Sequence, residues 1–190
     1  MSDTALVGNT LCLDFVNTVN KRPDPDRDDL ESPHSLVRWA SVAGIPMPPP
    51  PAAGSGKAAA ASLAEAVRLR EAVYGVFSAV AGGAEPPAAD AAVVLSFYGE
   101  ALASAGLARE GARCDLSWTP PCTIRKLTWR VATSAVRLLL EGPLDRVGEC
   151  PACHRLFLDT SRNGRRRWCD MAVCGSRVKA QRYYASQTGR

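Results

Sequence analysis

The amino-acid sequence predicts a mainly α-helical protein with one small β-hairpin, followed by a zinc-binding module of the treble-clef type. Three observations lead to this fold class: long segments with apolar residues at helical spacing, one short alternating segment, and two close pairs of cysteines near the C-terminus. A chain of 190 residues with 46% hydrophobic residues can bury a core, as one ordinary domain or two small ones. We place the helical domain at 1–145 and the zinc module at 146–190.

The first apolar segment, 11–19, fits a short buried helix or a short buried strand, and its pattern does not decide between them. Asp14 and Asn17 lie inside this segment, where an acid and an amide need hydrogen-bond partners. They either fix the neighbouring acidic loop, 21–31, which we expect to be exposed, or they line a ligand pocket. We therefore keep both residues as candidate ligand-binding residues.

The spacing of apolar residues predicts four helices in the helical domain, at 35–43, 58–81, 87–104 and 124–141. The last of them is apolar on two faces, which is typical of a helix packed between others. The proline-rich segment 46–57 is expected to be a surface loop. Residues 107–118 alternate around the turn-like Arg109-Glu110-Gly111 and predict the hairpin. The isolated cysteines Cys12, Cys114 and Cys122 are interpreted as plain buried thiols.

The C-terminal cysteines predict one structural zinc ion. Cys150 and Cys153 form one short-spaced pair, and Cys169 and Cys174 form the second, so each pair supplies two thiolate ligands. No coordination position remains for water or substrate, and a closed site of this kind is structural. The expected plan is a knuckle at 150–153, a strand at 155–159, a returning segment at 168–174 and a final helix through Ser186. The metal would supply about 10 kcal/mol or more of folding free energy.

The same cysteines allow two other interpretations. Cys150-Pro-Ala-Cys153-His154 matches the signature for covalent haem attachment, but that chemistry needs export and leaves the second cysteine pair unexplained. His154 is then a surface side chain or one that supports a zinc ligand. Oxidation of the cysteines with release of zinc is a further possible use of the site.

The basic charge is concentrated in the zinc module, which indicates a polyanionic partner. Residues 146–190 hold ten Lys or Arg against three Asp or Glu, a net charge of +7, whereas residues 1–145 carry −3. Nucleic acid is the expected partner, most simply duplex DNA. The candidate DNA-binding residues lie in the loop between the cysteine pairs and on the final helix: Arg165, Arg166, Arg167, Lys179 and Arg182. Arg162 and Arg177 are expected to brace the module instead.

The order of residues in the module resembles the CGNR zinc finger of bacterial regulators. The resemblance rests on the two cysteine pairs together with Ser161-Arg162-Asn163, Arg166-Arg167-Trp168 and Cys174-Gly175-Ser176-Arg177. Leu11-Cys12-Leu13-Asp14-Phe15-Val16-Asn17-Thr18 is similar to the opening of the ABATE domain that accompanies this finger. The resemblance implies a transcription regulator whose N-terminal domain senses a small molecule or a stress signal. Ser176 stands where the family name places asparagine, and as a capping residue it would preserve the start of the last helix.

Other classes of function find less support. The N-terminus lacks the pattern of a signal peptide and no long apolar run is present, so we expect a cytoplasmic protein without a membrane partner. The two histidines have no evident catalytic partner and there is no glycine-rich phosphate loop, so an enzyme is not expected. An RNA-binding protein and a protein–protein adaptor stay as alternatives. A homodimer is also left open.

Overall fold

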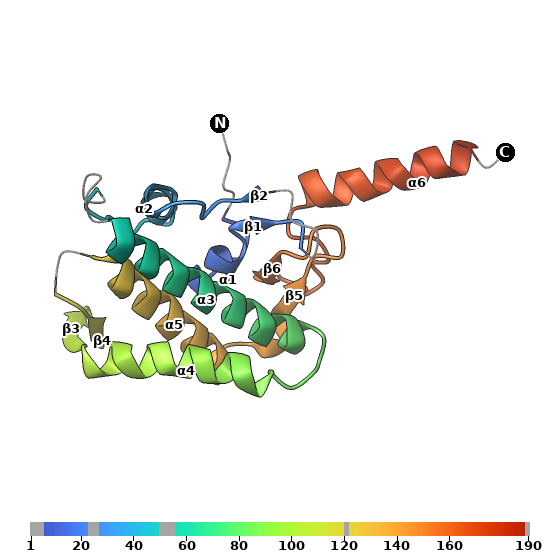
Figure 1. The fold of residues 1–190 in the computed structure, drawn as a ribbon. Helices are drawn as coiled ribbons and strands as arrows, with labels where there is room; N and C mark the ends of the chain where they lie inside the picture. The colour runs from blue at the N-terminus through green and yellow to red at the C-terminus, as the bar shows by residue number, and fades with distance from the viewer. Residues whose placement is uncertain (1–5, 23–26, 50–55, 120–121, 189–190) are drawn as a thin grey trace.

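The computed structural model describes residues 6–22, 27–49, 56–119 and 122–188. Three long helices, α3 (Gly56–Ala81), α4 (Ala88–Ala103) and α5 (Ile124–Glu141), lie side by side, with α1 (Leu11–Val16) against α3 and α5 (Figure 1). The shorter helix α2 (Pro33–Val42) packs on α3. The prediction of a mainly α-helical protein with small hairpins is therefore confirmed.

Local capping explains where several helices begin. Ser32 accepts a hydrogen bond from the N–H of Ser35, the Ser35 hydroxyl accepts one from the N–H of Ser32, and Pro33 follows at a position that favours helix entry. Thr123 accepts a hydrogen bond from the N–H of Lys126 at the start of α5. The undecided segment 11–19 is a helix through Val16. Part of the predicted loop 46–57 lies outside the described residues, and α3 begins at Gly56.

Helix α5 lies at the centre of the core, as its two apolar faces predicted. It contacts α1, α3 and α4, and its buried side chains include Leu127, Val131 and Ala135. Phe15 and Trp39 meet edge to face, with ring centroids 5.0 Å apart, which adds an aromatic contact to the burial of both rings. Each fully buried large side chain contributes about 1.5–3 kcal/mol through the loss of apolar surface to water. None of the helices in the described ranges is long and apolar enough to cross a bilayer.

The predicted hairpin consists of β3 (Gly106–Glu110) and β4 (Arg113–Ser117), which pair antiparallel with Leu107 opposite Leu116. Gly111 adopts φ 63° in the turn, a conformation that glycine accepts without strain. The interpretation of the three isolated cysteines as buried thiols needs correction at Cys114, which is exposed because it lies on the solvent side of β4. Cys122 is half-buried. Cys12 is fully buried, and its burial raises the pKa of the thiol to about 11.

The acidic loop near residue 28 is anchored by a buried arginine. Strands β1 (Val19–Asn20) and β2 (Arg27–Asp28) pair, and the buried guanidinium of Arg70 on α3 donates two hydrogen bonds to the Asp28 carboxylate, at 2.6 and 2.7 Å. A bidentate pair of this kind compensates for the cost of burying the arginine charge. The acidic loop is therefore fixed to the helical core at Asp28.

The C-terminal part of the chain continues the helical core. It contains η1 (Leu144–Arg146), the antiparallel strands β5 (Val147–Glu149) and β6 (Leu156–Leu158), the turn η2 (Met171–Gly175) and helix α6 (Ser176–Thr188). Val147 and Leu156 belong to the same hydrophobic cluster as the long helices. Helix α6 leaves this core and extends away from it (Figure 1).

Candidate metal centre and nucleic-acid surface

The four predicted zinc ligands converge in the structure. Cys150, Cys153, Cys169 and Cys174 are all buried, and their sulfur atoms lie within 4.8 Å of one another. The measured Sγ–Sγ distances are 3.4 Å from Cys153 to Cys169 and 3.6 Å from Cys174 to each of these two. A tetrahedron with Zn–S bonds of about 2.3 Å has sulfur atoms about 3.8 Å apart. Four thiolates at this spacing form a single, closed zinc site.

Backbone turns position the two pairs. The N–H groups of Cys153 and His154 both donate to the carbonyl of Cys150, and this knuckle joins β5 directly to β6. The second pair depends on η2, which starts where the Asp170 carboxylate accepts hydrogen bonds from the N–H groups of Ala172 and Val173. One expectation needs correction as a result. Asp170 rather than Ser176 caps the final helical run, because α6 continues without a break from η2, which is a π-helical turn.

Four sulfur atoms packed so closely cannot all ionise without a cation. Hydrogen bonds from Cys153 and Cys169 lower the pKa of Cys150, and contact with Cys150 and Cys153 together with burial raises the pKa of Cys169. A divalent ion removes this conflict because it stabilises all four thiolates together. Zinc binding therefore releases protons, and zinc affinity falls as the pH falls.

The zinc knuckle is tied to α3 through a glutamate. His154 contacts Glu149, with Nδ1 2.6 Å from Oε1, and the same carboxylate accepts hydrogen bonds from Tyr74 and Ser78 on α3. His154 adopts φ 58° at the end of the knuckle. The His154 side chain therefore supports the metal site through Glu149. This is one of the two roles that were expected for it from the sequence.

The N-terminal segment completes the zinc module. Val7 packs against the cysteine cluster, and the carbonyl of Gly8 accepts a hydrogen bond of 2.9 Å from the N–H of Leu158 on β6. Asn9 donates from Nδ2 to the Leu158 carbonyl at 2.8 Å. Residues that are about 150 positions apart in the sequence therefore form one unit around the metal.

Asp14 and Asn17 serve this same junction. The amide of Asn17, 5% exposed, pairs with the backbone of Leu156 through two hydrogen bonds of 2.8 and 2.9 Å. Asp14, 9% exposed, accepts a hydrogen bond of 2.7 Å from the N–H of Gly8. Burial raises the pKa of Asp14, against the opposing effects of this hydrogen bond and of the Arg166 charge.

The expectation of a ligand pocket at Asp14 and Asn17 is corrected by these contacts. Neither residue lines any of five cavities in the described part of the chain, and both side chains are occupied by backbone partners. Their role is structural, because they fix the first helix against β6 and the N-terminal segment.

Arg166 is a brace rather than a free cation. Its guanidinium donates to the carbonyls of Val7, Trp168 and Cys169, and it stacks over Phe157 at 4.5 Å from the ring centroid. This placement favours a structural role for Arg166 over the expected DNA contact, because its Nε and Nη2 groups already donate inside the module. Arg162 and Arg177, which were expected to brace it, are instead exposed.

Asp159 organises the loop that follows β6. Its carboxylate accepts hydrogen bonds from the N–H groups of Ser161 and Arg166, at 2.8 and 2.7 Å. Interaction with the Ser161 side chain, together with these backbone bonds, lowers the pKa of Asp159. Arg146 donates to the carbonyls of Asp159 and Ser161 from the other side. The loop is thus held at its base while its outer side chains face solvent.

Three of the four remaining candidate DNA-binding residues are exposed. Arg165, Arg167 and Lys179 all lie on the surface, and the guanidinium of Arg167 stacks over Trp168 at 5.2 Å from the ring centroid. The loop surrounds a hollow of about 520 Å³, whose lining includes Trp168 and all four arginines of the loop: Arg162, Arg165, Arg166 and Arg167. The side chain of Arg182 lies outside the described residues. The surface that the structure brings together is therefore the arginine loop 161–168.

The fold and the metal centre define a helical protein that carries a C-terminal four-cysteine zinc finger. Comparison with family models agrees with both parts. A model described as "Putative stress-induced transcription regulator", ABATE, matches residues 9–142, and the CGNR zinc finger model matches residues 146–187. The chain therefore belongs to the ABATE family and its C-terminal residues form a CGNR zinc finger, so the suspected resemblance is confirmed. A comparison with curated proteins gives no match. Neither matched family is an enzyme family.

Proposed function

We propose that this protein regulates transcription by binding duplex DNA through helix α6 and the arginine loop 161–168. The zinc ion holds the two elements in place and takes no part in chemistry, because its four ligands leave no open position. The helical domain serves as the regulatory part and responds to a small molecule. The proposal is supported by the family matches and above all by the position and composition of α6.

Helix α6 carries the proposal because its described side chains do not pack into a core. It projects from the body of the protein (Figure 1), and none of its described side chains is buried. A helix that is polar on all sides gains no stability from packing on a core. It is stabilised by pairs of side chains along the helix or by a binding partner. Residues 176–188 include Arg177, Lys179 and Arg182 and no acidic residue. Such a helix has the diameter and charge to enter a major groove.

The arginine loop supplies the second contact with the phosphate backbone. Arg165 and Arg167 are exposed beside the helix start, and Asp159 fixes the loop that carries them. Arginine binds phosphate through paired N–H donors, and phosphate contacts set the register of a protein on DNA. Met171 lines the same hollow as these arginines, so the loop and η2, which leads into α6, form one continuous surface.

A double substitution tests this surface. Arg165→Ala with Arg167→Ala should lower the slope of log affinity against log salt by roughly two for duplex DNA, because two phosphate contacts are lost. Fluorescence anisotropy across a salt series measures the slope, and zinc content should stay at the parent value. Arg166 is left in place, because its loss would disturb the module itself.

The control replaces two exposed arginines of the helical domain, Arg38→Ala with Arg113→Ala, which removes the same charge far from the metal. This protein should keep the parent slope. Equal slopes for all three proteins would show that the loop is not the contact surface. Absence of duplex binding at physiological salt would favour an adaptor, and tighter binding to single-stranded RNA than to the duplex would favour the RNA-binding alternative.

A further inference from the structure

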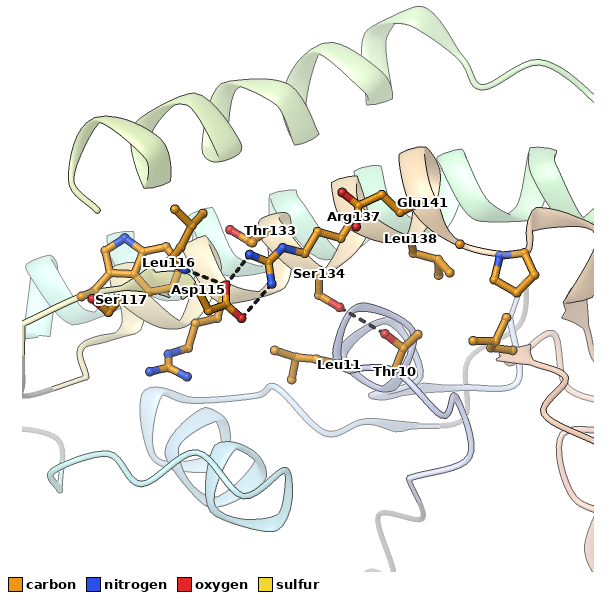
Figure 2. Close-up of a pocket in the computed structure, with 15 residues that line it drawn as sticks. Thr10, Leu11, Asp115, Leu116, Ser117, Thr133, Ser134, Arg137, Leu138 and Glu141 are labelled. Atoms are coloured by element: carbon orange, nitrogen blue, oxygen red, sulfur yellow. Dashed lines mark hydrogen bonds and ion pairs between the residues drawn. The ribbon is translucent and has the colours of Figure 1, made fainter. Parts of the chain in front are cut away.

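A large cavity in the described part of the chain lies at the junction of the hairpin, α5 and the zinc module. It has a volume of about 610 Å³, within the range of small-molecule sites. Figure 2 shows it between β4, which contributes Asp115 to Ser117, and the face of α5 that carries Ser134, Arg137 and Leu138. Thr10 and Leu11 close it below.

The chemistry of the cavity changes along α5. Arg130, Ser134, Arg137 and Glu141 follow one another on the face that lines it, over about 16 Å of helix. Arg130 and Arg137 lie in the N-terminal two-thirds of this length. Glu141, the carboxylate that α5 contributes to the cavity, lies at the C-terminal end of the helix. An anionic group is therefore favoured near Arg130 and Arg137 and disfavoured near Glu141.

The two arginines keep donors for a ligand. Arg137 pairs with Asp115 through Nη1 and Nη2, which leaves other N–H groups of its guanidinium unused by that pair (Figure 2). Arg130 lies over Trp118, with Cζ 5.8 Å from the ring centroid, and forms no ion pair with any described residue. The lining holds two guanidinium groups and two carboxylates, Asp115 and Glu141, so its formal charges balance. Arg130 is therefore the cavity cation that is left for a ligand, since Arg137 already pairs with Asp115.

Hydroxyl groups and apolar side chains complete the walls. Thr10 and Ser134 lie with their hydroxyl oxygens 3.2 Å apart (Figure 2). Thr133 is 6% exposed, and its Oγ1 has no hydrogen-bond partner within the described residues, which is uncommon for a buried hydroxyl away from functional sites. Beyond them, Leu138, Pro143 and Leu158 give the cavity an apolar end.

We propose that this cavity binds a small carboxylic acid with an apolar body. The carboxylate lies between Arg130 and Arg137, the hydroxyl groups of Thr10 and Ser134 meet the middle of the ligand, and its apolar body reaches Leu138 and Leu158. No covalent step is involved.

The cavity also offers a route from the ligand to the zinc module. Leu158 belongs to β6, and its N–H and carbonyl are bonded to Gly8 and Asn9, the segment that packs beside the metal centre. A ligand that contacts Leu158 and Thr10 therefore touches both sides of this junction. The regulatory consequence, a change in DNA affinity, rests on the function proposed above, whereas binding of the ligand does not.

Binding is tested on the full chain without DNA. The probes are butyrate, 4-phenylbutyrate and decanoate, each compared with its neutral amide, and ¹H–¹⁵N spectra report the residues that respond. At least one carboxylate should shift the signals of Ser117, Ser134 and Leu158 and should bind about tenfold or more tightly than its amide, because the guanidinium contacts are charge-assisted. If none of the three carboxylates shifts these signals, or if acid and amide bind equally, the proposal is wrong.

Two variants locate the carboxylate. Arg130→Gln should weaken the best carboxylate about tenfold and leave the amide unchanged, whereas Arg113→Gln, an exposed arginine on the same hairpin outside the cavity, should leave both unchanged. Equal losses in the two variants would mean a nonspecific charge effect and would overturn the site.

A DNA measurement separates this inference from the proposed function. At saturation the carboxylate should change duplex affinity about fivefold or more in the parent, with no change in Arg130→Gln. If the ligand binds but duplex affinity is constant, the cavity is a ligand site without the regulatory link. If the protein binds DNA but no carboxylate, the DNA-binding function stands and the cavity proposal fails.

Discussion

Replacement of Cys169 by serine should abolish zinc binding and unfold the C-terminal module. A hydroxyl is a poor ligand for zinc, and three remaining thiolates leave the tetrahedral site incomplete. The apparent binding free energy of structural zinc in small modules is about 10–16 kcal/mol, and most of it is folding free energy. Two turns hold the ligands, the knuckle at 150–153 and η2. Of these, the knuckle is also supported by the pairing of β5 with β6. Metal analysis should therefore fall from about one equivalent to none, with loss of helical signal from α6.

The matched control is Cys114→Ser, which changes an exposed cysteine on β4. It should retain the parent zinc content and the parent circular dichroism. The ligand assignment is wrong if Cys169→Ser keeps both its zinc and a folded α6.

A second large effect is expected from Asn17→Leu. The substitution removes two hydrogen bonds to Leu156 and leaves a buried backbone N–H and carbonyl without partners. Each unsatisfied group costs about 1–3 kcal/mol, so the free energy of unfolding should fall by about 2–6 kcal/mol. Because Leu156 lies on β6, which pairs with β5 at the base of the zinc knuckle, a chelator should also remove zinc faster. Urea denaturation and chelator competition measure the two effects.

Asn163→Leu serves as the comparison, because Asn163 is exposed in the arginine loop. Its effect on unfolding should stay within about 0.5 kcal/mol. Similar losses for the two variants would contradict the structural role assigned to Asn17.

The sequence allowed prediction of the elements because their signals are local. The apolar spacing of 124–141 and the turn residues at Arg109-Glu110-Gly111 depend only on nearby residues, and the structure has the helix and hairpin at these places. The zinc ligands were equally predictable, since two close cysteine pairs have few other uses in one chain. Segment 11–19 stayed undecided, because its short apolar pattern is common to helices and strands.

The role of individual polar residues depends on distant partners and could not be predicted. Asn17 pairs with a backbone 139 positions away, and Arg166 reaches the carbonyl of Val7 across 159 positions. Nothing in the run Arg165-Arg166-Arg167 distinguishes its middle member, although only that arginine points into the module. The pair of Arg70 and Asp28 is of the same kind, because it joins α3 to the acidic loop that was expected to be exposed.

The central claim is that DNA lies on α6 and the arginine loop, and hydrogen–deuterium exchange with and without duplex DNA tests it most directly. The amides of α6 should exchange fast in the free protein, because the helix has no buried face among its described residues. With DNA at saturation, protection should appear in 161–168 and 176–188 and be absent from α3 and α4. Protection confined to the helical domain, or unchanged exchange in α6, would contradict the account.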